Sequence, residues 1–284
     1  MISNSIQQVI DWLRARRIVN LVLVLVYFLL LLNLHKTLAQ LSVDFEHRIS
    51  IETYNTLIEV IYVVFLVLVI GVVWKHFKPN GDDNMLKLTC LSLTILFIFI
   101  HSRFMFDSNI EVIHSFEFIF LVFLIFPLVN RFGAAIFFTL PFMLFDEWYQ
   151  YAIIYPYLDY FDLNDIMMDT YGCGLAISTL MIIGIKGVQP IKPFWKRPEF
   201  LSLVSLLLLV LIAVKICLIA PYASDQCSNT LLTMNERTTP EPFLRPHPTH
   251  QIMFHVMKPL EALVAITTLH LFYFGLDSLR KNPA

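Results

Sequence analysis

Residues 145–172 place six carboxylates between two apolar runs and contain no Lys, Arg or His. The acids are Asp146, Glu147, Asp159, Asp162, Asp165 and Asp169. Carboxylates that lie close together cannot all ionise unless protons or a cation balance their charge. The missing counter-charge must therefore come from elsewhere in the fold, from solvent or from a ligand.

Polar residues recur at helical spacing in this part of the chain. They form three sets: Glu111, His114 and Glu117; Glu147 with Gln150; and Asp165 and Asp169 with Gly172. Residues three or four apart lie on one face of a helix, so each set forms a stripe. Counted inward from the predicted outer surface, each stripe has an acid about one to one and a half helical turns deep.

We predict that the polar side chains of these stripes converge in one outward-facing cavity that binds a ligand or protons. The predicted site residues are His114, Glu117, Glu147, Gln150, Asp165 and Asp169. An ionisable residue at the centre of a membrane helix costs about 2.5–3.5 kcal/mol on insertion scales, which makes such residues functional candidates. The alternative is that the acids only solvate an interface. Asp162 also fits a helix N-cap, where Asp is favoured.

The chain that must position these residues is strongly apolar. Of its 284 residues, 57% are hydrophobic and 15% are charged, whereas soluble domains carry about a quarter charged residues. This composition indicates an integral membrane protein. The net charge of -2 and the lack of a basic stripe argue against a nucleic-acid partner. The four Cys form no metal-binding pattern, and whether Cys217 and Cys227 pair is left open.

Eight apolar runs are long enough to cross about 30 Å of hydrocarbon, which takes roughly 20 residues. They cover residues 18–34, 56–74, 86–101, 112–130, 132–151, 164–185, 200–220 and 254–276. These runs are helices, because an open sheet would leave its edge hydrogen bonds unpaired in lipid. The expected fold is all-α, a polytopic membrane helix bundle of about eight transmembrane helices.

The distribution of basic residues predicts the orientation of these spans. With the N-terminus inside, the inner segments carry 13 of the 20 Lys and Arg residues, and the outer segments carry six. Positively charged loops stay on the cytoplasmic side. We therefore expect a multi-pass plasma (inner) membrane protein with both termini cytoplasmic and the acidic segment facing outward.

The order and spacing of the polar motifs resemble the VanZ-like family of small membrane proteins. The matching segments are "EVIHSFEF", "EWYQ" and "DIMMDTYG", which hold Glu111, His114, Glu117, Glu147, Gln150, Asp165, Asp169 and Gly172. The resemblance implies a VanZ-like four-helix core in residues 85–187. It leaves an amphipathic segment and two transmembrane helices in residues 1–84, and two helices with an extracytoplasmic loop in residues 188–284. Asp159 departs from the family, which usually has Arg there.

The resemblance implies a protein of the cell envelope that is associated with glycopeptide resistance. The acidic cleft then predicts a lipid-linked glycan or another lipophilic ligand, with membrane lipids as partners. No cofactor is required by this hypothesis.

Two other functions remain open. The run "DLNDIMMD" resembles the Asp-rich motif with which intramembrane prenyltransferases hold magnesium against a diphosphate. Its carboxylates Asp162, Asp165 and Asp169 make a metal-dependent enzyme acting on lipid phosphate one alternative. A proton-coupled transporter is the other, because membrane-embedded Glu, Asp and His residues form proton relays. The sequence has no GxSxG, HExxH or Walker motif, and leaves catalysis undecided.

Overall fold

The computed structural model describes residues 2–77, 84–105, 113–154, 161–188, 192–222, 225, 227–234, 245–246, 253–255 and 257–279. In these residues the chain is all-α apart from four two-residue strands. The α-helices are α1 (Ile2–Ala15), α2 (Arg17–Ile49), α3 (Ile51–His76), α4 (Asn84–Phe104), α5 (Ile113–Val129), α6 (Phe132–Tyr149), α7 (Leu163–Ile182), α8 (Pro198–Lys215) and α9 (Pro259–Leu279). Glu111 and Asp159 lie outside the described residues.

Each of the eight apolar runs lies largely within one of the helices α2 to α9. By length and composition, four of the described helices can cross a membrane, namely α2, α3, α4 and α8. Shorter apolar helices cover Ile113–Val129 and Pro259–Gly275. The chain is therefore a helical membrane protein, and α6 and α7 carry its acidic segment.

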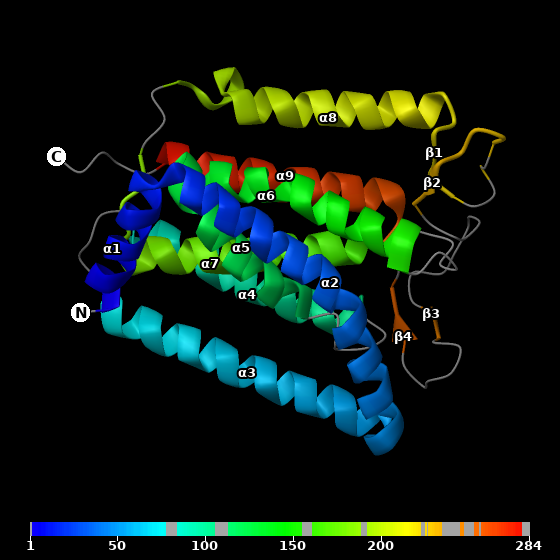
Figure 1. Cartoon of the computed structure of the whole chain (residues 1–284), viewed down its shortest axis with the longest axis horizontal. Coiled ribbons are helices and arrows are strands. Elements are labelled where there is room, and N and C mark those ends of the chain that lie inside the picture. The colour runs from blue at the N-terminus through cyan, green and yellow to red at the C-terminus, as the bar shows by residue number, and fades with distance from the viewer. Residues whose placement is uncertain are drawn as a thin grey trace.

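Helix α7 forms the centre of the bundle. It packs against α4, α5, α6 and α9, and its side chains from Leu163 to Leu175 are all buried. Helices α3 and α8 lie at opposite edges, and α2 crosses the bundle beside α5 (Figure 1). The N-terminal helix α1 lies at one end of the bundle, and the strands β1 (Ile219–Ala220) and β2 (Leu232–Thr233) lie at the other (Figure 1). We call these the α1 end and the β1 end.

Short connections fix the neighbours of the acidic segment. Helices α5 and α6 form the predicted tight hairpin, with only Asn130 and Arg131 between them. Asn130 has a φ of 58°, a left-handed conformation that Asn adopts more readily than most residues. At the other end of α6, a π-helical turn, η2 (Gln150–Ile154), continues the helix and keeps Gln150 buried. Such turns are frequent at functional sites.

The contact between α5 and α7 depends on a glycine. A Cβ atom at Gly172 would collide with the backbone of Ser115. Only a residue without a side chain lets the two helices approach so closely. Because Ser115 follows His114, this contact brings the polar stripes of α5 and α7 together.

The β1 end contains the small strand pairs and a disulfide bond. Strand β1 pairs with β2 in parallel, and β3 (Arg245–Pro246) pairs with β4 (Met253–Phe254) in antiparallel orientation. Cys217, just after α8, is bonded to Cys227, which settles the pairing that the sequence left open. Cys90 and Cys173 are free and buried.

Candidate functional site

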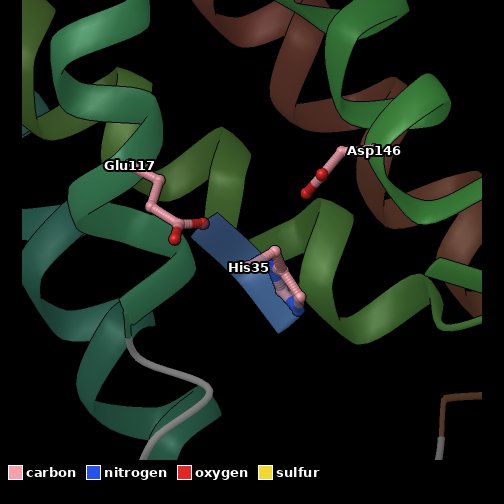
Figure 2. Close-up of side chains that lie close together, drawn as sticks. All are labelled: His35, Glu117 and Asp146. Carbon is pink, nitrogen blue, oxygen red and sulfur yellow. The ribbon is translucent and has the colours of Figure 1, made fainter. Parts of the chain in front are cut away.

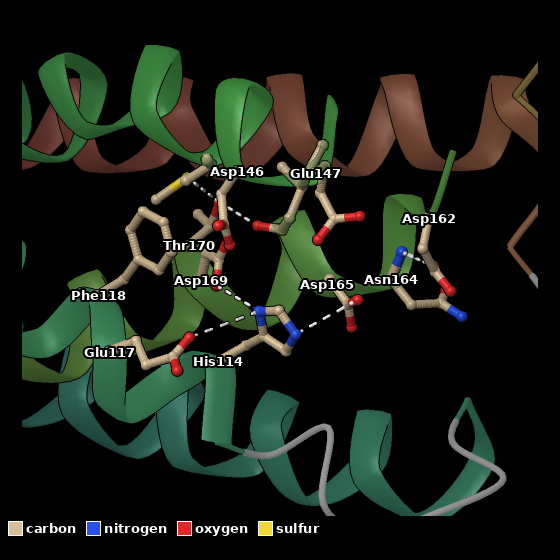
Figure 3. Close-up of polar contacts among 12 residues, drawn as sticks. His114, Glu117, Phe118, Asp146, Glu147, Asp162, Asn164, Asp165, Asp169 and Thr170 are labelled. Carbon is tan, nitrogen blue, oxygen red and sulfur yellow. Dashed lines mark hydrogen bonds and ion pairs between the residues drawn. The ribbon is translucent and has the colours of Figure 1, made fainter. Parts of the chain in front are cut away.

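A cluster of buried or nearly buried ionisable and amide side chains lies where α2, α5, α6 and α7 meet. We call it the polar centre. It comprises His35, His114, Glu117, Asp146, Glu147, Gln150, Asp165 and Asp169. The six residues predicted from the sequence are all among them. Figure 3 shows the side chains of His114, Asp165 and Asp169 directed toward one another, with Glu147 of α6 close by.

His114 of α5 is the hub of the polar centre. Its Nε2 atom lies 3.4 Å from Oδ2 of Asp165, and its Nδ1 atom lies 3.4 Å from Oδ1 of Asp169. Glu117 is 4.0 Å from the same Nδ1 atom, measured to Oε2. The ring therefore faces α7 with both nitrogens, as Figure 3 shows.

Gln150 orients the two carboxylates that α6 contributes to the polar centre. The Gln150 amide donates to Oδ2 of Asp146 at 3.2 Å and to Oε1 of Glu147 at 2.9 Å. One neutral donor thus holds two adjacent carboxylates. It orients them without neutralising their charge.

His35 of α2 completes the polar centre from the remaining side. Its ring centroid is 5.4 Å from that of His114, and the side chain is buried. Figure 2 shows the carboxylates of Glu117 and Asp146 pointing toward the space around the His35 ring. The hydroxyl of Tyr27, two turns earlier on α2, donates to the backbone oxygen of Glu117 at 2.8 Å. This bond fixes α2 against α5 and so sets the position of His35.

The polar centre is nearly enclosed, and several of its carboxylate oxygens lack a hydrogen-bond partner. Asp146 and Asp169 are fully buried, and the other acids are at most 12% exposed. Oδ1 of Asp146, Oε2 of Glu117 and Oδ2 of Asp169 lack a hydrogen-bond partner. In ordinary folds, buried charges are paired or bind a metal. In the described residues these side chains form a largely buried cluster, and the outward-facing cavity expected from the sequence stays a prediction.

Asp162 lies outside the polar centre and has a structural role. Its Oδ1 atom accepts the backbone N–H of Asn164 at 2.8 Å, so Asp162 is the N-cap of α7. This matches the capping alternative considered for the sequence. Of the acidic run proposed to hold magnesium, Asp165 and Asp169 lie in the polar centre, and Asp162 caps the helix that carries them (Figure 3).

Two residues of the polar centre were missed in the sequence. His35 ends an apolar run, and a lone His at that depth was a usable signal. Asp146 was noted as an acid but was not predicted as a site residue. Adjacent helical residues point about 100° apart, so a stripe that contains Glu147 does not predict Asp146 on the same face.

An apolar crevice lies between α6, α7, α8 and α9. It has a volume of about 140 Å³ and is lined mainly by α8 and α9 together with α6 and α7. Its lining includes Leu144, Ile166, Leu206, Leu207, Leu263 and Ile266. Leu144 and Glu147 are three apart on α6, and Ile166 follows Asp165 on α7. The crevice and the polar centre therefore lie at the same level of the bundle.

No family model matches the chain, and no curated protein or solved structure matches it either. The resemblance to the VanZ-like family therefore remains a prediction from short motifs. What the polar centre does must be argued from its own chemistry.

Proposed function

We propose that this protein is a multi-pass envelope protein that binds a membrane-dissolved amphiphile. In this proposal the polar head group reaches the polar centre and the hydrocarbon chain occupies the apolar crevice. The observation that carries it is that the two sites share α6 and α7 at one level of the bundle. Ligand sites commonly combine a largely apolar lining with a few convergent polar groups.

The proposal includes eight spans with both termini in the cytoplasm. Eight helices coincide with the apolar runs, and the basic residues favour this orientation. The disulfide bond supports it independently, because Cys217 and Cys227 lie at the β1 end, away from α1 (Figure 1). Disulfides persist in oxidising compartments, so the β1 end would face outward.

The envelope setting and the amphiphile agree with the VanZ-like resemblance. A lipid-linked glycan precursor is the ligand class that the resemblance suggests, and a lipophilic antibiotic is the other. Both combine a polar head with an apolar part. Carboxylates alone repel a phosphate, so a phosphate head group would need a bound cation as intermediary.

Filling the crevice tests the proposal. Leu144→Trp and Leu207→Trp should remove an amphiphile that copurifies with the wild-type protein in nanodiscs formed from native membrane, as measured by mass spectrometry of extracted lipids. Leu208→Trp is the matched control, because Leu208 is 55% exposed on α8 and is not part of the crevice lining. Thermal unfolding checks that each variant folds. Identical lipid profiles for all folded variants would exclude the crevice as a ligand site.

Labelling tests the orientation. Leu231→Cys, at an exposed position near β2, should react with a membrane-impermeant maleimide on intact cells. Lys186→Cys, exposed near the α1 end, should react only after the membrane is opened. The reverse pattern would invert the topology.

A further inference from the structure

We propose that the polar centre holds two divalent transition-metal ions, each bound by one His, one Glu and one Asp. The first set is His35, Glu117 and Asp146, and the second is His114, Glu147 and Asp165. This inference goes beyond the amphiphile proposal, because metal binding at these residues does not require the apolar crevice.

The geometry of each set fits one ion. In both sets the three ligand atoms lie within 4.8 Å of one another. Metal–ligand bonds of about 2.1 Å allow two ligands of one ion to lie at most about 4.2 Å apart. An inward movement of a few tenths of an ångström by each side chain therefore closes either set around a metal. In the second set, Nε2 of His114 and Oδ2 of Asp165 are already 3.4 Å apart.

The ligand types indicate which metals fit. Imidazole nitrogen together with carboxylate oxygen suits Mn²⁺, Fe²⁺ or Zn²⁺, whereas Mg²⁺ prefers oxygen ligands and retains several waters. Helix bundles also provide a known scaffold for paired ions. In carboxylate-bridged centres of such bundles, two His and several acids from four helices point inward. Here the two His and the acids come from α2, α5, α6 and α7.

The unpaired atoms point to a ligand independently of the clustering. Asp146 is fully buried with Oδ1 unpartnered, and it points toward His35 (Figure 2). The Nδ1 atom of His35 and Oε2 of Glu117 also lack hydrogen-bond partners. Every residue of the first set thus has an unpartnered polar atom, and the set brings one ligand atom of each residue within 4.8 Å of the others. Leaving three such atoms buried without a partner costs free energy that a metal ion would offset.

The surroundings of His114 match the usual support of a metal-bound His. A ligating His normally donates its second ring N–H to a carboxylate, which fixes the ring and its tautomer. With Nε2 directed at the ion, Nδ1 faces Oδ1 of Asp169 at 3.4 Å. Asp169 belongs to neither ligand set, and it is a positioning residue for His114.

The charges also agree with two ions. The polar centre has five carboxylates, and Asp146 and Glu147 receive only the neutral amide of Gln150 in the described residues. His114 is the basic group that pairs with Glu117 and Asp169. Two divalent ions would offset four of the five negative charges.

Metal analysis of the full-length protein in detergent tests the inference. After stripping with EDTA and loading with Mn²⁺ or Zn²⁺, elemental analysis should give two equivalents for the wild type. Asp146→Asn and Glu147→Gln should each leave one equivalent, because each removes a ligand from a different set. His270→Gln is the control: His270 is fully buried on α9, its Nδ1 bonds the Ile266 oxygen, and it should leave two equivalents.

Thermal unfolding gives a second readout. Metal should raise the Tm of the wild type and of His270→Gln, and raise it less in the two ligand variants. Equal metal content in all four proteins would overturn the inference, and so would a wild-type protein that binds only one equivalent. Leu144→Trp should keep both ions, so a failure of the amphiphile proposal would leave this result unchanged.

Discussion

The two ends of the bundle both bury carboxylates, but they treat them differently. At the α1 end, Glu199 is buried and accepts two hydrogen bonds from Arg131, at 2.6 and 3.2 Å. Asp277 accepts the backbone N–H groups of Phe132 and Gly133, each at 3.0 Å. Toward the β1 end, Asp146 and Asp169 are as deeply buried and retain unpartnered oxygens.

This difference separates structural acids from candidate ligands. Glu199 and Asp277 join the start of α6 to α8 and α9, and the fold itself supplies their partners. A buried acid with such partners is satisfied. Within the described residues, Asp146, Glu117 and Asp169 keep carboxylate oxygens without a hydrogen-bond partner, so a partner from outside the chain is expected for them. Burial alone does not identify a site, whereas burial without a partner does.

The largest expected effect is at the α1 end. Arg131→Ala should destabilise the protein by about 3 kcal/mol, because removing one partner leaves Glu199 buried and uncompensated. Thermal unfolding in detergent measures this. The double variant Arg131→Ala/Glu199→Gln should recover most of the loss, since the orphaned charge is gone. If the single and double variants were equally stable, Glu199 would not be a paired structural acid.

The next prediction tests whether the polar centre depends on the close contact between α5 and α7. Gly172→Ala should cost about 2 kcal/mol, because the new methyl group meets the Ser115 backbone and pushes α7 from α5. It should also lower metal content, since Asp165 moves away from His114. Gly71→Ala is the control, because a Cβ there meets nothing within 4 Å. A Gly172→Ala protein that keeps wild-type stability would show that the close helix contact is not required.

Much of the fold could be predicted because the bilayer restricts it. Long apolar runs in a bilayer must become helices, and each of the eight apolar runs lies largely within a helix of the described residues. The α5–α6 hairpin was also predictable, since only Asn130 and Arg131 separate two apolar runs. What the sequence could not provide is the rotation of each helix about its axis. That rotation is set by packing, such as the contact of Tyr27 with Glu117 that aims His35 at His114.

The same limit applies to the site. Helical spacing identified the stripes of α5 and α7 and placed their acids at similar depth. It could not show that Asp146 and Glu147 would both be enclosed, because this requires α2 and α7 to pack on α6 together. The π-helical turn at Gln150 has no clear signal in the sequence. Its amide nevertheless joins the two carboxylates.

A third experiment is expected to raise the stability of the protein, whereas the changes at the α1 end lower it. Asp146→Asn should stabilise the metal-free protein, by about 1–2 kcal/mol, because it removes a buried carboxylate that lacks a full set of partners. Neutralising Glu199 alone should destabilise, because Arg131 then loses its partner. Melting curves in EDTA compare the two variants. Destabilisation of equal size in both would mean that the two ends of the bundle do not differ.

The smallest expected effect concerns Asp169, which faces His114 and belongs to neither ligand set. Asn keeps an acceptor oxygen at nearly the same size, so Asp169→Asn can still accept the Nδ1–H of His114. Losing a carboxylate that supports a metal-bound His typically weakens metal affinity about tenfold to a hundredfold. Because Asn keeps an acceptor, Asp169→Asn should weaken metal affinity by about tenfold or less. Asp165→Asn should instead remove one ion. Isothermal titration calorimetry with the metal distinguishes the two variants, with Asp169→Ala as the variant that lacks the acceptor.

If Asp169→Asn lost a whole equivalent of metal, Asp169 would be a ligand, and the contrast between paired and unpaired acids would need a third ion-binding set. If Asp169→Ala also behaved like the wild type, the contact with His114 would contribute nothing, and the orientation of that ring would have to come from the α5–α7 packing alone.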